Sequence, residues 1–169
     1  MENLYLVRPS KEYQKSFEAY VLAYKEAGDD FYFNIYKKAL ENYDEYIKEL
    51  HNNSEGIDIP EGWVPSSTFW LINNDEVVGV TRVRHQEVGQ CGHIGCDISP
   101  NHRGKGYGTE MLKLALKEAS KLGIKDAVAT CNLDNIASKT MMEKNGGKLL
   151  GMVYDEWKKE NLLKFTFET

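Results

Sequence analysis

The sequence predicts a single α/β domain over residues 1–169, with a mixed, mostly antiparallel sheet flanked by helices. Three observations carry this prediction: two amphipathic segments near the N-terminus, a run of three strand patterns, and a strand–helix–strand unit that follows them. The length suits one domain with a substantial core, and no repeat, low-complexity tract or interdomain linker interrupts the chain.

The first part of the chain predicts a short strand at residues 4–7 and a helix that Gly28 ends. A second helix is expected from about residue 32 to residue 50, with one aromatic-rich face. We interpret its tyrosines as core residues whose hydroxyls reach the surface, and the alternative is that some line an acceptor cleft. Residues 51–66 lack periodicity and are expected to form a long loop.

The rest of the chain predicts a meander, one strand–helix–strand unit, a further helix and two closing strands. The expected strands are residues 67–72, 76–85, 91–98, 126–131, 148–154 and 162–168. A helix follows at once on the glycine-rich stretch that extends to Gly108, and its apolar residues recur at spacings of three and four from Met111 until Gly123 ends it. Asn135 is expected to cap the next helix, which extends to residue 145.

Composition and charge exclude several classes of protein. The net charge of −5 and the lack of a lysine–arginine cluster argue against a nucleic-acid partner. No apolar run approaches the roughly 18 residues of a membrane span, and residues 1–4 do not begin a signal peptide. Three cysteines without a Cys-x-x-Cys pair indicate reduced thiols, and we expect a cytoplasmic protein.

A basic, glycine-rich turn opens the helix of the strand–helix–strand unit. Gly104, Gly106 and Gly108 lie where the first backbone N–H groups of a helix lack partners and where the helix dipole is positive. Glycine removes the β-carbons that would keep a ligand from those amides. Arg103 and Lys105 add positive charge, so the turn predicts a phosphate-binding site.

The spacing of the turn excludes two kinds of phosphate site. A Walker loop needs a lysine followed by serine or threonine after its second glycine, and neither is present. Residues 104–109 read Gly-x-Gly-x-x-Thr, which approaches a dinucleotide fingerprint. However, Asp126 precedes an apolar strand instead of closing one, so it does not fit the ribose-binding acid.

The pattern Arg-x-x-Gly-x-Gly at Arg103, Gly106 and Gly108 resembles the acyl-CoA pyrophosphate loop of the GNAT superfamily of N-acetyltransferases. The strand and proline before the loop and the amphipathic helix after it fit this resemblance, which extends over residues 69–154. Gly-His-Ile-Gly at residues 92–95 and the segment 143–147 resemble a bacterial-type group of predicted acetyltransferases. The resemblance implies a GNAT-like acyl-CoA N-acyltransferase fold.

The resemblance also implies an acetyl-CoA-dependent N-acetyltransferase that is a monomer or homodimer and uses acetyl-CoA as co-substrate, without a metal. The acceptor is expected to be a primary amine of a small molecule or peptide that attacks directly in a ternary complex, because no cysteine forms a recognisable nucleophile–base pair. The implied cofactor-binding residues are Ile98 (backbone to pantetheine), Arg103, Gly104, Lys105, Gly106, Tyr107, Gly108, Thr109, Asn135 and Ser138. The alternative is a non-catalytic acyl-CoA-binding or sensing module.

His93 stands where many members of the family have a glutamate that acts as the base. Strand alternation places His93, Gly95 and Asp97 on one face. Imidazole, with an ordinary pKa of about 6.5, suits a base at neutral pH. We therefore expect His93 to be the catalytic base, and the alternative is a strand histidine satisfied by a backbone carbonyl.

Met142 stands where the family has its usual acid, a tyrosine seven residues after the capping asparagine. Either the thiolate leaves without a protein acid, or Tyr107, Tyr154, Cys131 or Ser138 replaces the tyrosine, or catalysis is weak. A zinc site at Cys91, His93 and Cys96 is not expected, because alternation points Cys96 away from the other two.

Overall fold

The computed structural model describes residues 2–169. Its strands are β1 (Tyr5–Val7), β2 (Ser66–Asn73), β3 (Glu76–Val88), β4 (Gly92–Ile98), β5 (Asp126–Asn132), β6 (Lys148–Asp155) and β7 (Glu160–Glu168). Its helices are α1 (Gln14–Glu26), α2 (Asp30–Tyr36), α3 (Lys38–Glu41), α4 (Tyr43–Glu55), α5 (Tyr107–Lys121) and α6 (Ile136–Lys144), with short 3₁₀ turns at Lys11–Tyr13 and Pro100–His102. Within the described residues, no helix is both long enough and apolar enough to cross a membrane.

The strands form two antiparallel sheets, in the orders β1-β2-β3-β4 and β5-β7-β6. The predicted meander is confirmed by the ladders that pair β2 with β3 and β3 with β4. Asn74 and Asp75 form the hairpin turn with φ values of +49° and +63°, the left-handed conformation that these residue types tolerate best after glycine. Together with the flanking helices, the ladders confirm the predicted mostly antiparallel α/β fold.

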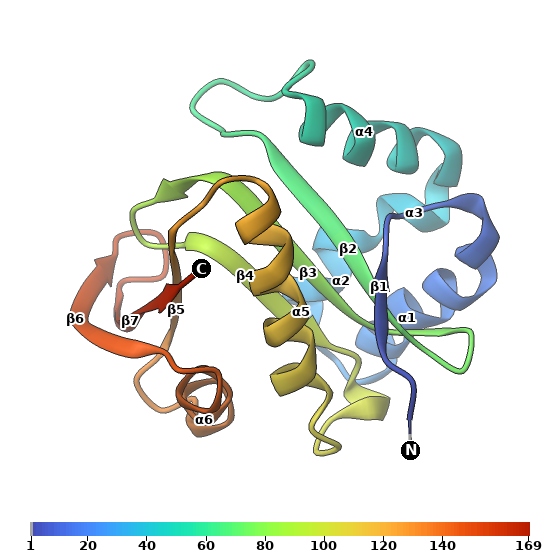
Figure 1. Ribbon diagram of the computed structural model, residues 1–169. Coiled ribbons are helices and arrows are strands. Elements are labelled where there is room, and N and C mark those ends of the chain that lie inside the picture. Colours follow the sequence, from blue (N-terminus) through green and yellow to red (C-terminus); the bar gives the residue numbers. More distant parts are fainter. Residues whose placement is uncertain (1) are drawn as a thin grey trace.

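Helices cover both faces of the first sheet (Figure 1). Trp70 and Ile72 on β2 pack in a core with residues of α1 to α4. Leu71, which lies between them, points to the opposite face and packs in a core with Met111 of α5. This alternation fixes α5 across one side of the sheet and the N-terminal helices across the other.

A third core joins α5 to the second sheet. It combines Leu112, Ala115 and Ala119 of α5 with residues of β4, β5, α6 and β7. Because α5 contributes to the cores on both sheets, it fixes where β4 and β5 lie relative to each other. The space between these two strands is where the cavities described below are found.

The prediction of one helix over residues 32–50 is wrong. The segment is divided into α2, α3 and α4. Asn42 interrupts it, because its side-chain oxygen accepts the N–H of Glu45 and caps a new helix. The expected loop also begins late, since α4 extends to Glu55 and ends at Gly56 with φ +72°.

Candidate functional site

Two adjoining cavities of about 510 and 480 Å³ lie between β4, β5, α5 and α6. The first, here the strand cavity, is lined by α2, β3, β4, β5 and the end of β6. The second, here the loop cavity, is lined by the turn before α5 and the end of β4. Five residues line both cavities, and we call them the junction: Tyr32, Cys96, Asn135, Ser138 and Met141. One molecule can therefore extend from one cavity into the other.

The glycine-rich turn forms the wall of the loop cavity. Gly104 and Gly106 have φ values of +76° and +81°, which a residue with a β-carbon rarely adopts. A β-carbon built on either would meet no atom within 4 Å, so the turn is open. The first hydrogen bond of α5 joins Glu110 N–H to Gly106 O at 3.3 Å. The N–H groups of residues 107–109 therefore have no carbonyl of α5 to bind, and together they can bind an anion.

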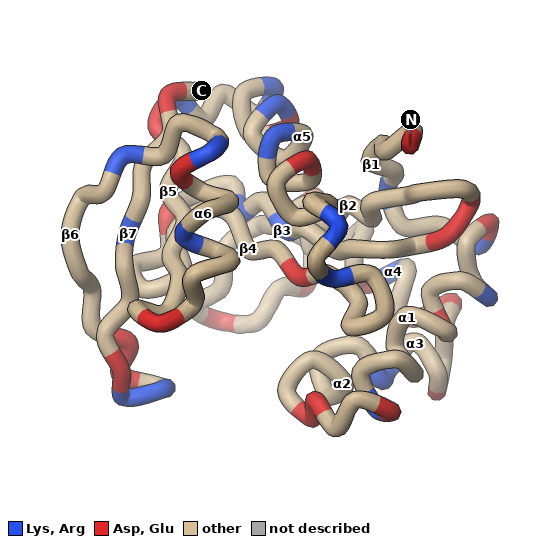
Figure 2. Tube along the Cα trace, turned by 90° about the horizontal axis from the view of Figure 1, so that it is seen from below, with Lys and Arg blue, Asp and Glu red and all other residues tan. Residues whose placement is uncertain are grey.

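The basic residues of this turn are placed differently. Arg103 lines the loop cavity, and its Nε donates to Ile98 O at 3.2 Å. Lys105 does not line it, and its Nζ lies 6.0 Å from the Tyr107 ring centre. Both belong to the basic segment that leads into α5 (Figure 2). This positive charge lies beside the anion-binding amides.

Tyr107 lines the loop cavity, but its hydroxyl is bonded elsewhere. It donates to a Glu2 carboxylate oxygen at 2.6 Å and accepts from Asn73 Nδ2 at 2.9 Å. The Ile98 carbonyl is similarly engaged, because it accepts from Arg103 Nε and lies 3.1 Å from the Tyr24 hydroxyl, whose one hydrogen it shares with Asp97. An N–H of a bound pantetheine that donated to Ile98 O would therefore compete with these contacts.

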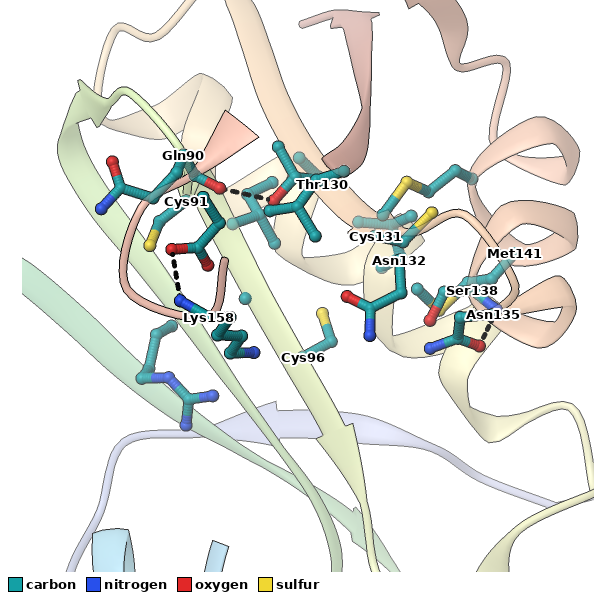
Figure 3. A pocket seen from close by; sticks show the side chains of 18 of the residues that line it. Gln90, Cys91, Cys96, Thr130, Cys131, Asn132, Asn135, Ser138, Met141 and Lys158 are labelled. Atoms are coloured by element: carbon teal, nitrogen blue, oxygen red, sulfur yellow. Dashed lines mark hydrogen bonds between the residues drawn. The ribbon is translucent and has the colours of Figure 1, made fainter. Parts of the chain in front are cut away.

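The start of α6 brings two predicted residues to the junction. Asn135 Oδ1 accepts the Ser138 N–H at 3.1 Å, which confirms Asn135 as the cap of this helix (Figure 3). At the other end of α6, Asn145 Nδ2 donates to Thr109 O at 3.0 Å and to Met141 O at 2.9 Å. These bonds hold α6 against the first turn of α5. Of the predicted cofactor-binding residues, all except Lys105 line the loop cavity.

The strand cavity contains three thiols. Cys91, Cys96 and Cys131 all line it (Figure 3). Burial raises the pKa of Cys96 to about 11 and also raises the pKa of Cys131. These two thiols are protonated near neutral pH, and a protonated thiol is a poor nucleophile.

The ionised groups of the strand cavity come from two places. Arg82 and Arg84 extend from β3, while Asp155 ends β6 and Lys158 lies in the connection to β7. Asp155 Oδ1 accepts the N–H groups of Trp157 at 2.9 Å and Lys158 at 3.2 Å. Among the described residues that line this cavity, Asp155 is the one carboxylate.

Asp97 is a buried carboxylate next to the junction, and the sequence analysis placed it on β4 without foreseeing its partners. Asp97 accepts hydrogen bonds from the hydroxyls of Tyr20, Tyr24 and Tyr36, at 2.6, 2.8 and 2.6 Å, and pairs with Arg82 at 3.1 Å. Because these donors come from α1, α2 and β3, the network holds the N-terminal helices against β4. It explains part of the aromatic pattern that the sequence analysis interpreted as core.

Tyr32 was also missed. It is a junction residue and comes from α2, in the aromatic-rich segment. Burial raises its pKa to about 12, with a smaller contribution from the charge of Asp97. The hydroxyl is therefore protonated at neutral pH and can donate a hydrogen bond. The alternative reading of the tyrosines, as residues lining a cleft, is the only signal in the sequence that pointed to it.

His93 lies apart from these groups. It lines neither cavity, and its Nδ1 accepts the backbone N–H of Val128 at 3.0 Å. A neutral imidazole that accepts at Nδ1 carries its proton on Nε2, so no lone pair is free to take a proton. Burial also lowers its pKa. This geometry argues against the predicted role of His93 as the base and favours the structural alternative.

The position of the usual acid is occupied by a core residue. Met142 is 3% exposed and packs in the core between α5 and the second sheet. Of the four candidate replacements, Cys131 and Ser138 line the strand cavity, while Tyr154 is 53% exposed and lines neither cavity. In residues 2–169, no group of three or more histidine, cysteine or acidic side chains could hold a metal ion.

Comparison with known proteins gives one family and one fold. A family model described as an acetyltransferase (GNAT) domain matches residues 4–148. No curated protein matches the sequence.

Solved structures with similar folds are known at low sequence identity. One is the microcin C7 self-immunity acetyltransferase MccE in complex with acetyl-CoA and AMP, with a TM-score of 0.71, 16% identity, and coverage of 98% of this chain and 92% of that one. A second is RimL, a ribosomal L7/L12 α-N-protein acetyltransferase in complex with coenzyme A, with a TM-score of 0.73, 16% identity and coverage of 98% and 93%. The third is Mycobacterium smegmatis RimJ with CoA-disulfide, with a TM-score of 0.75, 13% identity and coverage of 98% and 82%.

Proposed function

This chain belongs to the GNAT family of acetyltransferases, and from that premise we propose that it transfers the acetyl group of acetyl-CoA to a primary amine of a small molecule or peptide. The observation that carries the proposal is the junction, where the anion-binding turn before α5 meets a second cavity. A cofactor with a diphosphate at one end and a thioester at the other needs such an arrangement if the thioester is to meet a second substrate.

The cofactor binds in the loop cavity in this proposal. Its diphosphate accepts hydrogen bonds from the backbone N–H groups of residues 107–109, and Arg103 adds positive charge from the same turn. Its thioester reaches the junction near Asn135 and Ser138. Lys105, which lies outside the cavity lining, contributes only through its charge.

The acceptor amine enters from the strand cavity. Its nitrogen attacks the thioester carbonyl carbon, a C–N bond forms, the C–S bond breaks, and the thiolate of coenzyme A leaves. The raised thiol pKa values of Cys96 and Cys131 support this direct attack over an acyl-enzyme route. The name of RimL, a ribosomal L7/L12 α-N-protein acetyltransferase, supports a peptide amine as one class of acceptor.

Two side chains are placed to move the protons. We assign the base to Asp155, the carboxylate on the strand cavity, which takes a proton from the acceptor ammonium. We assign the donor to Tyr32, a junction hydroxyl that can protonate the leaving thiolate or hydrogen-bond the thioester oxygen. The sequence-based assignment of the base to His93 remains the competing hypothesis.

The experiment follows thiol release from acetyl-CoA with a panel of amines, together with calorimetry of CoA binding. We expect saturable CoA binding and amine-dependent thiol release. CoA binding without turnover on any amine would favour a binding or sensing module instead. We also propose that residues 1–169 act as one domain, that the protein is a monomer or homodimer, and that its free thiols suit the cytoplasm.

A further inference from the structure

Two arginine side chains of β3 lie side by side on the wall of the strand cavity. Gly95 of β4 pairs with Arg82 across the sheet. A β-carbon at Gly95 would lie 3.7 Å from Nη2 of Arg82 and 3.7 Å from both Nη1 and Nη2 of Arg84. Both guanidinium groups therefore lie over the same glycine, and both line the cavity.

These two cations differ in their partners. Arg82 pairs with Asp97 at 3.1 Å and donates to the Tyr36 hydroxyl at 2.7 Å. Arg84 forms no ion pair with any acidic side chain of residues 2–169, and its Nη1 is buried without a hydrogen-bond partner in that part of the chain. A buried guanidinium nitrogen without a partner, beside another cation, is unfavourable, and a bound anion would offset that cost.

The surroundings of Arg84 indicate what kind of anion fits. The cavity of about 510 Å³ also has an apolar wall from Phe31 and Ile35. Lys158 lies at the same wall, with its Nζ 4.9 Å from the Phe31 ring centre. Asp155, the carboxylate on this cavity, already accepts two backbone N–H groups. The cavity therefore combines excess positive charge with room for an apolar side chain.

We propose that Arg84 binds the carboxylate of the acceptor, so that the acceptors are amines that carry a carboxylate, such as free amino acids. The inference rests on the proposed acetyl transfer and names its acceptor class. The planar guanidinium matches a carboxylate with two parallel hydrogen bonds. Phe31 and Ile35 contact the rest of the acceptor, which leaves its amine to reach the junction.

The experiment compares amines of equal shape with and without the anion: phenylalanine against phenylalaninamide, and methionine against methioninamide. We expect wild-type kcat/KM to favour each acid by roughly tenfold or more. Arg84→Gln should lower kcat/KM for the acids by roughly tenfold to a hundredfold, mainly through KM, and leave the amides unchanged. Arg84→Lys should retain part of the preference.

Arg8→Gln is the matched control, because Arg8 lies outside both cavities and its Nη1 donates to Thr68 O. It should leave the preference for the acids intact. Equal kcat/KM for acids and amides would overturn the inference while leaving the acetyltransferase function in place. A phosphonate analogue of phenylalanine preferred over phenylalanine would also overturn it, in favour of a phosphate-bearing acceptor.

If neither member of any pair is acetylated, N-acetylphenylalanine is titrated into the protein with and without CoA. Binding that Arg84→Gln weakens by tenfold or more supports the proposed carboxylate site. No binding to the wild type overturns it. Failure of the proposed function is seen separately, as the absence of amine-dependent thiol release from acetyl-CoA across the whole amine panel.

Discussion

The Nδ1 atom of His93 on β4 accepts a hydrogen bond of 3.0 Å from the backbone N–H of Val128 on β5. At the same place a β-carbon on Gly92 would lie 2.5 Å from the Val128 carbonyl oxygen, so the two strands are in close contact. A second bond, from Thr130 Oγ1 to Gln90 O at 2.9 Å, joins the same region. Since β4 and β5 share no ladder among the described strands, these contacts fasten the two sheets together beside the strand cavity.

His93→Ala is therefore expected to reduce stability more than turnover. It leaves the Val128 N–H without its partner, at a cost of about 0.5–1.5 kcal/mol in the free energy of unfolding because the site is partly exposed. Denaturant titration measures the loss, and kcat/KM per folded molecule should remain close to wild type. A fall in kcat/KM of roughly 10²-fold or more, at unchanged stability, would restore His93 as the base.

The same substitution has a pH signature. Burial lowers the folded-state pKa of His93, so the unfolded chain binds more protons near the ordinary value of about 6.5. The stability from the neutral ring is complete above that pH and is lost as the pH falls through the folded pKa. The difference in stability between wild type and His93→Ala should therefore shrink on acidification. A difference that is constant from pH 8 to pH 5 would contradict this role.

Gly106→Asp tests the anion site. The substitution places a carboxylate beside the bound diphosphate and forces a side chain into φ +81°. CoA affinity should fall more than tenfold, which is over about 1.4 kcal/mol. Gly62→Asp is the control, because Gly62 has φ +82°, equally open space and no place in either cavity. Calorimetry that finds equal CoA affinity in the two folded variants would refute the site.

Tyr32→Phe tests the proposed donor at the junction. Removing the hydroxyl should lower kcat/KM by about 10²-fold and leave CoA affinity nearly unchanged. Because the pKa of Tyr32 is raised to about 12, the hydroxyl stays protonated and should add no falling limb to the wild-type rate below pH 10. Tyr154→Phe, at an exposed residue outside both cavities, is the control. Full turnover in Tyr32→Phe would exclude this role.

Asp155→Asn separates charge from structure. The amide oxygen of asparagine can still accept the N–H groups of Trp157 and Lys158, so the β6–β7 turn should persist. If Asp155 is the base, kcat/KM should fall by about 10²-fold with little change in melting temperature. Glu156→Gln is the control: it removes the charge of a neighbouring residue that does not line the cavity, and it should leave kcat/KM unchanged. Normal turnover in Asp155→Asn would leave the carboxylate a structural role only.

The elements that the sequence predicted best are those that local rules control. α5 follows the glycine-rich turn as expected and begins at Tyr107, because the glycines and the apolar periodicity both mark it. Asn135 caps α6 for a similarly local reason. The hydrogen-bond partners of Asp97 could not be predicted, because Tyr20 and Tyr24 are more than 70 residues away in the sequence. The sequence also could not predict that Arg82 forms an ion pair and Arg84 does not, because this depends on which guanidinium group reaches Asp97.

Met142 shows where a family pattern and local packing disagree. Residue 142 is the position at which the family has a tyrosine, yet the Met142 side chain is 3% exposed and packs in one core with Leu112 and Phe165. Tyrosine is larger, and overpacking a filled core usually costs about 1–3 kcal/mol. Restoring the family's hydroxyl therefore has an energetic cost that the sequence alone did not reveal.

Met142→Tyr is accordingly expected to lower the melting temperature while leaving kcat/KM per folded molecule equal to or above that of wild type. Turnover should be retained or raised because Met142 lines the strand cavity, where the phenol of a tyrosine would add a second hydrogen-bond donor near the leaving sulfur. Met142→Leu is the control, since a swap of similar volume should change stability by less than about 1.5 kcal/mol and supply no donor. Thermal unfolding and thiol release on the same samples distinguish the two effects. If Met142→Tyr is as stable as wild type, the tyrosine ring extends into the strand cavity and does not overpack the core. A stable variant with reduced turnover would show that the ring blocks the acceptor instead of assisting the leaving group.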